Sequence, residues 1–125
     1  MKILVVENSQ PIRERLLSLL ARSGRYEGIA CAPSSAVLML GETLQPAALL
    51  VDVRLNGISG FQLLKDLRAL GFIVPVVMLS ASGDAKYPLH AEALGANAFI
   101  CKTTDFEKII PTLDRLLTIV ASTTP

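Results

Sequence analysis

Short apolar segments alternate with longer amphipathic segments five times along the 125-residue chain, and this alternation constrains the fold more than any other feature. Several of the short segments are apolar almost throughout, as strands buried on both faces are. Five strands are predicted, at Lys2–Val6, Tyr26–Cys31, Ala47–Val51, Val74–Leu79 and Ala98–Cys101. Strands that alternate with helices through short connections indicate an α/β domain, in which helices cover both faces of a parallel sheet.

The segments between the strands carry helix start and stop signals. In the first of them, Ser9 fits the N-cap position, Pro11 fits the opening turn, and Gly24 ends the helix. Three further helices are predicted over about 34–44, 60–70 and 87–95, and a last one carries an apolar stripe from 106 to 120. Pro111 falls inside this last helix, which therefore either begins close to Glu107, with proline near its first turn, or kinks at the proline.

Composition and net charge limit the classes of protein to which the chain can belong. The chain is 51% hydrophobic and 18% charged, which is typical of a globular domain and not of a disordered chain. We expect one domain over residues 1–121, with 122–125 as a tail or the start of a linker. Apolar stretches reach only about eight residues, too few to cross a bilayer, and the start lacks a secretory pattern, so we expect a cytoplasmic protein without membrane contact. The net charge of +1 shows no basic excess of the kind that nucleic-acid-binding surfaces carry.

The two cysteines, Cys31 and Cys101, each lie within an apolar, strand-like segment. Two isolated thiols in a chain without a secretory signal favour reduced core residues, and a disulfide or a metal pair is the alternative. The only histidine, His90, lies on a predicted helix, where we expect it at the surface or half-buried.

Isolated polar residues follow four of the predicted strands. In an open parallel sheet the working site lies at the carboxyl ends of the strands, so these side chains are expected to converge. They are Glu7 and Asn8 after the first strand, Asp52 after the third, Ser80 after the fourth and Lys102 after the fifth. Such a set suits a divalent cation held by oxygens, and a phosphoryl group held by the cation, the hydroxyl and the lysine. Each residue alone has a structural explanation, such as helix capping, but capping does not require all five at one edge.

Four segments of the chain, taken together, resemble the receiver domains of response regulators. They are Ile3–Ser9, Leu50–Gly60, Val76–Ala81 and Gly95–Lys102. In order and spacing they are similar to the family's opening strand with its acidic pair, its phosphoacceptor segment, its fourth strand and the approach to its lysine. The resemblance covers essentially the whole chain. It implies a (βα)5, flavodoxin-like receiver fold, with a five-stranded parallel sheet in the order 2-1-3-4-5.

The resemblance also implies a role for each polar residue at the strand ends. Asp52 would be the phosphoacceptor, the nucleophile that attacks a phosphohistidine on a partner kinase. Ser80 and Lys102 would bind the phosphoryl group. The implied ligands of Mg²⁺ are Glu7, Asn8, Asp52 and the backbone carbonyl of Arg54. The protein would supply position and charge neutralisation to the transferring group.

A conformational switch is implied as well. Phe99 occupies the aromatic switch position, which in the family turns inward as the hydroxyl residue, here Ser80, moves toward phosphate. The face formed by the fourth helix, the fifth strand and the fifth helix would then change and bind a partner, or a second copy as a homodimer. The implied phosphodonor is a sensor histidine kinase or a phosphotransfer protein, and the domain itself would bind no nucleic acid. It would not be an enzyme, because it would catalyse only its own phosphorylation and dephosphorylation.

The chain departs from the family pattern in three ways. Glu7-Asn8 replaces the usual two aspartates, which removes one negative charge and predicts weakened Mg²⁺ binding. Thr103 stands where the family commonly has a proline with a cis bond, so we expect a trans bond there. Arg54 places a long cation beside the phosphorylation pocket, where its charge could alter the access of water.

Two other functions compete with phosphoacceptance. A pseudo-receiver would use the same fold only to bind proteins, with weak or no Mg²⁺-dependent phosphorylation; Glu7-Asn8 favours it, and the retained phosphoacceptor and phosphoryl-binding residues disfavour it. A flavodoxin-like cofactor or hydrolase domain would need a Ser/Thr/Gly-rich phosphate loop after the first strand, or a Gly-x-Ser-x-Gly motif. Residues 7–11 do not form such a loop, and the motif is absent.

Overall fold

The computed structural model of the protein describes residues 1–41 and 45–122, with side chains as far as Thr118. Its strands form one sheet in the order β2-β1-β3-β4-β5, in which every neighbouring pair is parallel. They are β1 (Lys2–Val6), β2 (Glu27–Ala30), β3 (Ala48–Asp52), β4 (Val76–Ser80) and β5 (Ala98–Cys101). The predicted fold class and strand order are confirmed. The largest difference between a predicted and an observed strand boundary is at the start of β4, which begins at Val76 and not at Val74. Pro75 has no N–H to donate to a neighbouring strand.

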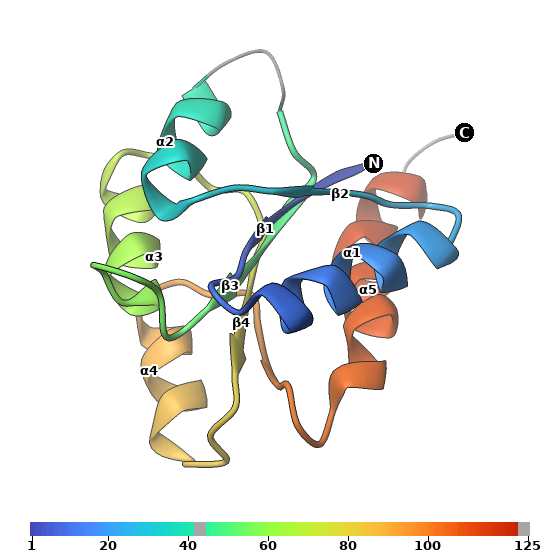
Figure 1. Ribbon diagram of the computed structural model, residues 1–125. Coiled ribbons are helices and arrows are strands. Elements are labelled where there is room, and N and C mark those ends of the chain that lie inside the picture. The colour runs from blue at the N-terminus through green and yellow to red at the C-terminus, as the bar shows by residue number, and fades with distance from the viewer. Residues whose placement is uncertain (42–44, 123–125) are drawn as a thin grey trace.

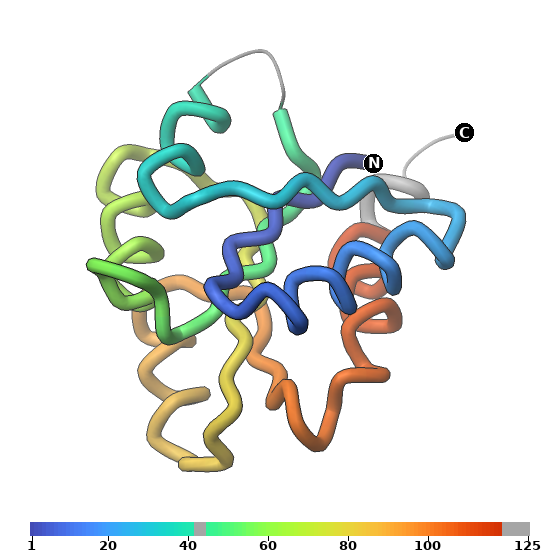
Figure 2. The backbone as a smooth tube through the Cα atoms, viewed as in Figure 1, coloured from blue at the N-terminus to red at the C-terminus, as the bar shows by residue number. Residues whose placement is uncertain are grey.

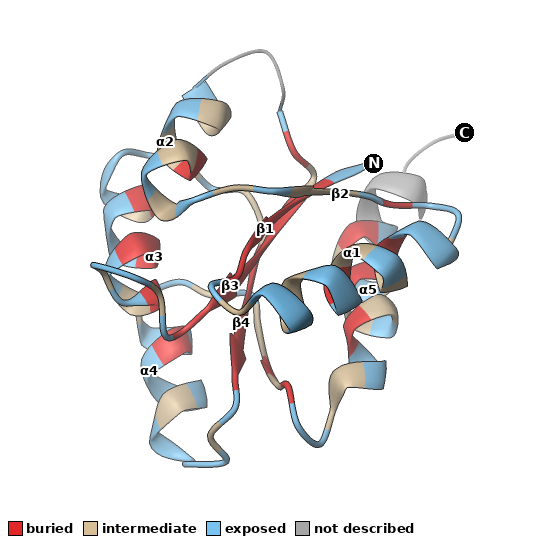
Figure 3. Ribbon diagram, viewed as in Figure 1, coloured by how far each residue is buried: buried red, intermediate tan, exposed pale blue. Residues whose placement is uncertain are grey.

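Helices cover both faces of the sheet (Figure 1). They are α1 (Gln10–Arg22), α2 (Pro33–Gly41), α3 (Gly60–Ala69), α4 (Lys86–Ala93) and α5 (Ile109–Ser122), with a short 3₁₀ helix, η1 (Phe106–Lys108), before α5. Two apolar clusters reflect this division, one between the sheet and α1 with α5, the other between the sheet and α2, α3 and α4. Figure 3 shows the central strands buried, and all five residues of β3 and of β4 are buried. Burial on both faces explains why these segments are apolar throughout.

The ends of α1 and α5 follow from their prolines and glycines. Pro11 lies in the first turn of α1, and Gly24 follows the helix with a positive φ of 74°. Ser9 precedes α1 as predicted, but its side chain makes no capping hydrogen bond. The short helix η1 precedes α5, which begins at Ile109. Pro111 therefore lies in the first turn of α5, and the helix does not need to kink there. The first of the two alternatives for Pro111 is confirmed.

The other predicted helix ends are close to those observed. The predicted end of the second helix, at 44, lies outside the described residues, as do 123–125 of the predicted tail. Ser122 is the last residue of α5, one residue beyond the predicted domain end. All peptide bonds of the described residues are trans, including the bond before Thr103, as predicted.

Arg68 holds together the edge of the sheet at the amino ends of β4 and β5. Its guanidinium, at the end of α3, donates five hydrogen bonds of 2.9–3.1 Å. The acceptors are the carbonyl oxygens of Phe72, Val74 and Gly95 and the Oδ1 of Asn97. Burial lowers the pKa of Arg68. The guanidinium thus fixes the loops before β4 and β5 through neutral acceptors alone.

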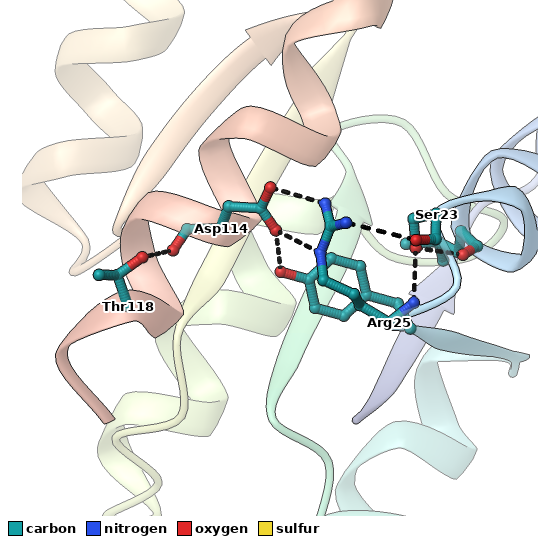
Figure 4. Close-up of polar contacts among 6 residues, drawn as sticks. Ser23, Arg25, Asp114 and Thr118 are labelled. Carbon is teal, nitrogen blue, oxygen red and sulfur yellow. Dashed lines mark hydrogen bonds and ion pairs between the residues drawn. The ribbon is translucent and has the colours of Figure 1, made fainter. Parts of the chain in front are cut away.

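A second polar cluster joins the start of β2 to α5 (Figure 4). The Arg25 guanidinium contacts both carboxylate oxygens of Asp114, at 3.2 and 2.7 Å, and the Tyr26 hydroxyl donates to Asp114 Oδ1 at 2.6 Å. The Tyr26 hydrogen bond, ahead of the Arg25 contacts, lowers the pKa of Asp114. Thr118 donates to the carbonyl of Asp114 one turn further along the helix.

Candidate functional site

The polar residues predicted from the sequence lie at the carboxyl edge of the sheet. Figure 2 shows the loops after β1, β3, β4 and β5 on the same side of the molecule. Among the residues whose burial is described, only four polar or charged side chains are buried, and all four belong to the predicted set. They are Glu7 (4% exposed), Asp52 (6%), Ser80 (4%) and Lys102 (9%). Buried charges are costly unless they are paired, so the concentration of these four side chains at one edge indicates the candidate functional site of the domain.

Lys102 joins the strand ends. Its Nζ lies 3.0 Å from Glu7 Oε2 and 3.0 Å from Asp52 Oδ2. Its backbone N–H donates to the carbonyl of Ser80 at 2.7 Å, which ties the end of β5 to the end of β4. Two carboxylates therefore share one ammonium, and with all three ionised the cluster carries one net negative charge.

Each oxygen of Glu7, in the side chain and in the backbone, accepts a hydrogen bond. Oε1 accepts the Ser9 N–H at 3.1 Å, Oε2 accepts from Lys102, and the backbone carbonyl accepts from Arg13 Nη1 at 3.2 Å. Burial raises the pKa of Glu7, and the charge of Asp52 acts in the same direction, against the hydrogen bonds from Ser9 and Lys102. The side chain thus points into the charged cluster, although burial and the Asp52 charge disfavour its ionised form.

The segment after Asp52 folds back over the strand end. Gly60, the first residue of α3, donates its N–H to the carbonyl of Val53 at 2.7 Å, and a Cβ there would collide with the backbone carbonyl of Asp52. Gly57, within the loop, has a φ of 80°, a conformation that glycine adopts without strain. Ser59 caps α3 by accepting the Gln62 N–H at 3.1 Å. Each glycine of the phosphoacceptor-like segment therefore has a physical reason. Gly60 lets the backbone approach the carbonyl of Asp52 closely, and Gly57 adopts the left-handed conformation of the turn.

Asp52 faces a cleft of about 310 Å³. Its lining residues are Asp52, Arg54, Ser80, Ala81, Ser82 and Lys102. Ser80 Oγ accepts the Ser82 N–H at 3.0 Å, which leaves the hydroxyl hydrogen of Ser80 able to donate to another group. The cleft thus brings together a carboxylate, a hydroxyl and an ammonium, and Arg54 also lines it. A phosphoryl group suits this combination of charge and donors.

Asn8 does not line the cleft of Asp52. It is exposed and borders a larger cleft of about 620 Å³, which it shares with Glu7, Arg13 and residues of the loops after β2 and β3. In residues 1–41 and 45–122, no group of three or more His, Cys, Asp or Glu side chains forms a metal cluster. The oxygens predicted as ligands are hard donors that suit Mg²⁺, and two of them, Glu7 Oε2 and Asp52 Oδ2, lie 3.0 Å from the Lys102 ammonium.

Phe99 is half-buried in β5 and borders two clefts, one on the side of Ser82 and one on the side of α4. His90 is exposed, as expected, with its ring edge-to-face against Phe61, 4.5 Å between centroids. Both cysteines are free thiols. Burial raises the pKa of Cys31 to about 11, whereas hydrogen bonds from Thr103 and Thr104 lower that of Cys101 to about 7.

Three contributors to the site were not predicted. Ser9 and Arg13 hold Glu7, and Ser82 holds Ser80. The contact with Ser82 has a sequence signal in Ser80, because a Ser side chain commonly accepts the backbone N–H two residues further on in a turn. Ser9 was expected as a cap and acts instead through its amide, and nothing in the sequence places the Arg13 side chain.

Comparison with known proteins agrees with this geometry. The profile of the response regulator receiver domain matches residues 3–114. The chain belongs to the receiver domain family of two-component response regulators. Its receiver fold is shared with a Francisella response regulator receiver domain, at a TM-score of 0.84 and 20% identity over 95% of this chain and 98% of that one. The chemotaxis protein CheY4 of Vibrio cholerae matches at a TM-score of 0.79 and 24% identity, over 93% and 98% of the two chains.

Curated relatives of the receiver domain are signal-transduction regulators. The transcriptional regulatory protein FixJ of Azorhizobium caulinodans is 35% identical over 85% of this chain and 50% of its own. The response regulator PhoP of Pseudomonas aeruginosa is 30% identical over 94% of this chain and 52% of its own. The chain thus spans about half the length of the curated relatives it matches. In the described part of the receiver domain, no helix has the length and apolar character needed to span a membrane.

Proposed function

We propose that this receiver domain accepts a phosphoryl group on Asp52 from a phosphohistidine of a sensor histidine kinase or a phosphotransfer protein. One observation carries the proposal: Asp52 is a buried carboxylate at the end of β3, 3.0 Å from the Lys102 ammonium, in a cleft that Ser80 also lines. A buried carboxylate held against a cation beside an open cleft suits a nucleophile better than a helix cap.

The transfer requires position and charge more than covalent chemistry from the protein. A carboxylate oxygen of Asp52 forms a bond to phosphorus while the P–N bond to the donor imidazole breaks, and that electron pair stays on the imidazole nitrogen. The Lys102 ammonium and the Ser80 hydroxyl are the donors in the cleft for the charged phosphoryl oxygens. The domain catalyses only its own phosphorylation and dephosphorylation, and is not otherwise an enzyme.

Mg²⁺ is the proposed cofactor, held by oxygens among Glu7, Asn8, Asp52 and the Arg54 backbone carbonyl. When bound, the ion neutralises charge on the transferring group. The neutral amide at Asn8 gives the cation less charge than a carboxylate would, so we propose weak binding.

Phosphorylation is proposed to act on the surface formed by α4, β5 and α5. Movement of the Ser80 hydroxyl toward phosphate would free space for Phe99, a residue that borders two clefts. The changed surface would bind an output partner or a second copy of the domain. We place the protein in the cytoplasm, where such phosphodonors act, and propose that this domain contacts neither nucleic acid nor membrane.

Incubation with acetyl phosphate and Mg²⁺, followed by intact-protein mass spectrometry, tests the proposal. We expect the mass of one phosphoryl group on the wild type and none on Asp52→Asn. Asp84→Asn is the matched control, because Asp84 is an exposed aspartate in the loop after β4, and it should label like the wild type. A wild type that takes no label from acetyl phosphate or from a phosphorylated kinase would overturn the proposal in favour of the pseudo-receiver.

A further inference from the structure

The loop between β3 and α3 contains the dipeptide Asn56-Gly57, and both of its residues are exposed. In such a dipeptide the backbone nitrogen of the second residue reaches the side-chain amide of the first with little hindrance, because glycine has no Cβ. We propose that Asn56 is a modification site, at which the side chain loses ammonia through a cyclic imide formed with Gly57 and becomes a carboxylate. The inference goes beyond the proposed function, because this reaction requires no phosphodonor.

The modification needs only water and hydroxide. Hydroxide removes the proton of the Gly57 N–H, and the nitrogen forms a bond to Cγ of Asn56 while the C–N bond of the side-chain amide breaks. The leaving nitrogen takes a proton from water, which returns the hydroxide, and departs as ammonia. Water then opens the imide at either of its two carbonyls, which gives aspartate or isoaspartate. The net change replaces NH₂ by OH, with a gain of about 1 Da and one negative charge.

Both reacting groups of the Asn56-Gly57 dipeptide are available in the fold. Among the hydrogen bonds of the described residues, none involves the Asn56 side chain and none has the Gly57 N–H as its donor. Gly57 has a φ of 80°, and a Cβ built on it would meet no atom of the described residues within 4 Å. Closure of the imide ring therefore breaks no hydrogen bond of the fold, and the space around Gly57 is open.

The other two asparagines of the chain, Asn8 and Asn97, are held by the fold. The Ser9 N–H, whose nitrogen would have to attack the Asn8 side chain, donates to Glu7 Oε1 at 3.1 Å. Oδ1 of Asn97 accepts two hydrogen bonds, of 2.9 and 3.1 Å, one of them from Arg68. At Asn8 the nucleophile is thus occupied, and at Asn97 the amide is fixed. The dipeptide sequence and the fold therefore select the same asparagine.

A carboxylate at position 56 changes the charge of the larger cleft. Asn56 lines this cleft of about 620 Å³ together with Glu7, Asn8 and Arg13. The neutral amide of Asn8 leaves the proposed Mg²⁺ site short of negative charge, and a carboxylate across the same cleft supplies part of it. We therefore expect the modified domain to bind Mg²⁺ more tightly. This consequence rests on the proposed cofactor, whereas the modification itself does not.

Peptide mass spectrometry of the folded protein, incubated near neutral pH without any phosphodonor, tests the modification. Asn56 should lose ammonia about tenfold faster than Asn8 or Asn97, because no hydrogen bond has to break before the ring closes. Both aspartate and isoaspartate should form at position 56, because the imide opens in two ways. Gly57→Ala should slow the reaction by hindering the attack. Asn56→Gln, which would need a larger ring, should stay unmodified under the same conditions.

The same incubation in denaturant separates the effect of the fold from that of the dipeptide sequence. In the unfolded chain Asn8 and Asn97 should react about tenfold faster than in the folded protein, since their hydrogen bonds are lost. Asn56 should keep its rate within about threefold, because the fold does not restrain it. An NMR titration of Asn56→Asp then tests the consequence, and we expect Mg²⁺ affinity about two- to fivefold above that of the wild type.

The modification is contradicted by any of three results. They are a rate at Asn56 more than about tenfold lower in the folded protein than in the unfolded chain, equal rates at the three asparagines of the folded protein, and aspartate without isoaspartate at position 56. Equal Mg²⁺ affinity of Asn56→Asp and wild type would overturn the consequence for the metal. None of these measurements uses labelling of Asp52, which decides the proposed function separately.

Discussion

The two edges of the sheet each use one cation to hold loops together, and they differ in what surrounds it. At the edge formed by the amino ends of β4 and β5, the Arg68 guanidinium meets only neutral acceptors, and its five hydrogen bonds use all of its donors. At the carboxyl edge, the Lys102 ammonium meets Glu7 and Asp52, both buried. The first arrangement leaves no group able to react, whereas the second leaves a surplus carboxylate charge beside a cleft. A cation that is fully used indicates a structural role, and one shared by more carboxylates than it can neutralise indicates chemistry.

Removal of Lys102 gives the largest expected effect on this comparison. In Lys102→Met two buried carboxylates remain without their cation, so the free energy of unfolding should fall by about 3–5 kcal/mol at neutral pH. Part of the loss should be recovered on acidification, because Glu7, whose pKa burial already raises, takes up a proton. Denaturant unfolding at two pH values measures this. Lys65→Met, at an exposed lysine of α3, is the control, and a Lys102→Met protein as stable as the control would show that the carboxylates do not depend on the ammonium.

Removal of Arg68 should affect stability alone. Arg68→Met leaves several carbonyls short of a donor, and we expect a loss of about 2–4 kcal/mol in the free energy of unfolding. The rate of acetyl-phosphate labelling, measured under conditions where the variant is folded, should stay within about twofold of the wild type. Arg22→Met, at an exposed arginine of α1, is the matched control for stability. If Arg68→Met slowed labelling as strongly as Lys102→Met, the two edges would not be functionally separate.

An acidic residue at position 8 should strengthen Mg²⁺ binding at the carboxyl edge of the sheet. Asn8→Asp adds a negative charge, and we expect Mg²⁺ affinity to rise about ten- to a hundredfold, with faster acetyl-phosphate labelling. Asn56→Asp adds the same charge at an exposed asparagine of the same larger cleft, and it should raise the affinity less. Equal Mg²⁺ affinity of wild type and Asn8→Asp in a titration would show that the side chain at position 8 does not face the metal.

The smallest expected effects are opposite pH dependences of two carboxylates. The pKa of Asp114 is lowered, so its stabilisation is present above its ordinary value of 3.8 and is lost as the pH falls through the lowered pKa. The pKa of Glu7 is raised, so its stabilisation is present below its ordinary value of 4.5 and is lost as the pH rises through the raised pKa. The stability difference between wild type and Asp114→Asn should be small for this exposed pair and should grow with pH.

The corresponding difference for Glu7→Gln should change with pH in the other direction. Denaturant unfolding between pH 3 and pH 7 follows both variants. Parallel pH profiles of the two differences would contradict the contrast between the exposed and the buried carboxylate.

The carboxyl edge was largely predictable from the sequence, because a polar residue that ends an apolar strand can lie only at one edge of a parallel sheet. Asp52, Ser80 and Lys102 were placed correctly on that ground, and the order of the strands followed from the resemblance to receiver domains. The direction of the Glu7 side chain was not predictable. It depends on the Ser9 amide and on Lys102, far apart in the sequence, and on side-chain length.

The opposite edge was not predicted at all. The Arg68 guanidinium binds backbone carbonyls, which every residue has, so no sequence pattern marks it. The Arg25–Tyr26–Asp114 cluster joins residues 88 and 89 positions apart, and a pair of opposite charges in a sequence does not say which will meet. Contacts of a cation with neutral acceptors, and contacts between residues far apart in the sequence, can be placed only from the folded chain.

The central claim, that the buried carboxylate at the end of β3 is the phosphoacceptor, is tested most directly by locating the acyl phosphate within the chain. The domain is labelled with acetyl phosphate and Mg²⁺, the acyl phosphate is trapped by borohydride reduction, and the modified residue is identified by peptide mass spectrometry. We predict modification at Asp52 alone. Modification at Glu7 or Asp84, or labelling that persists in Asp52→Asn, would contradict the claim.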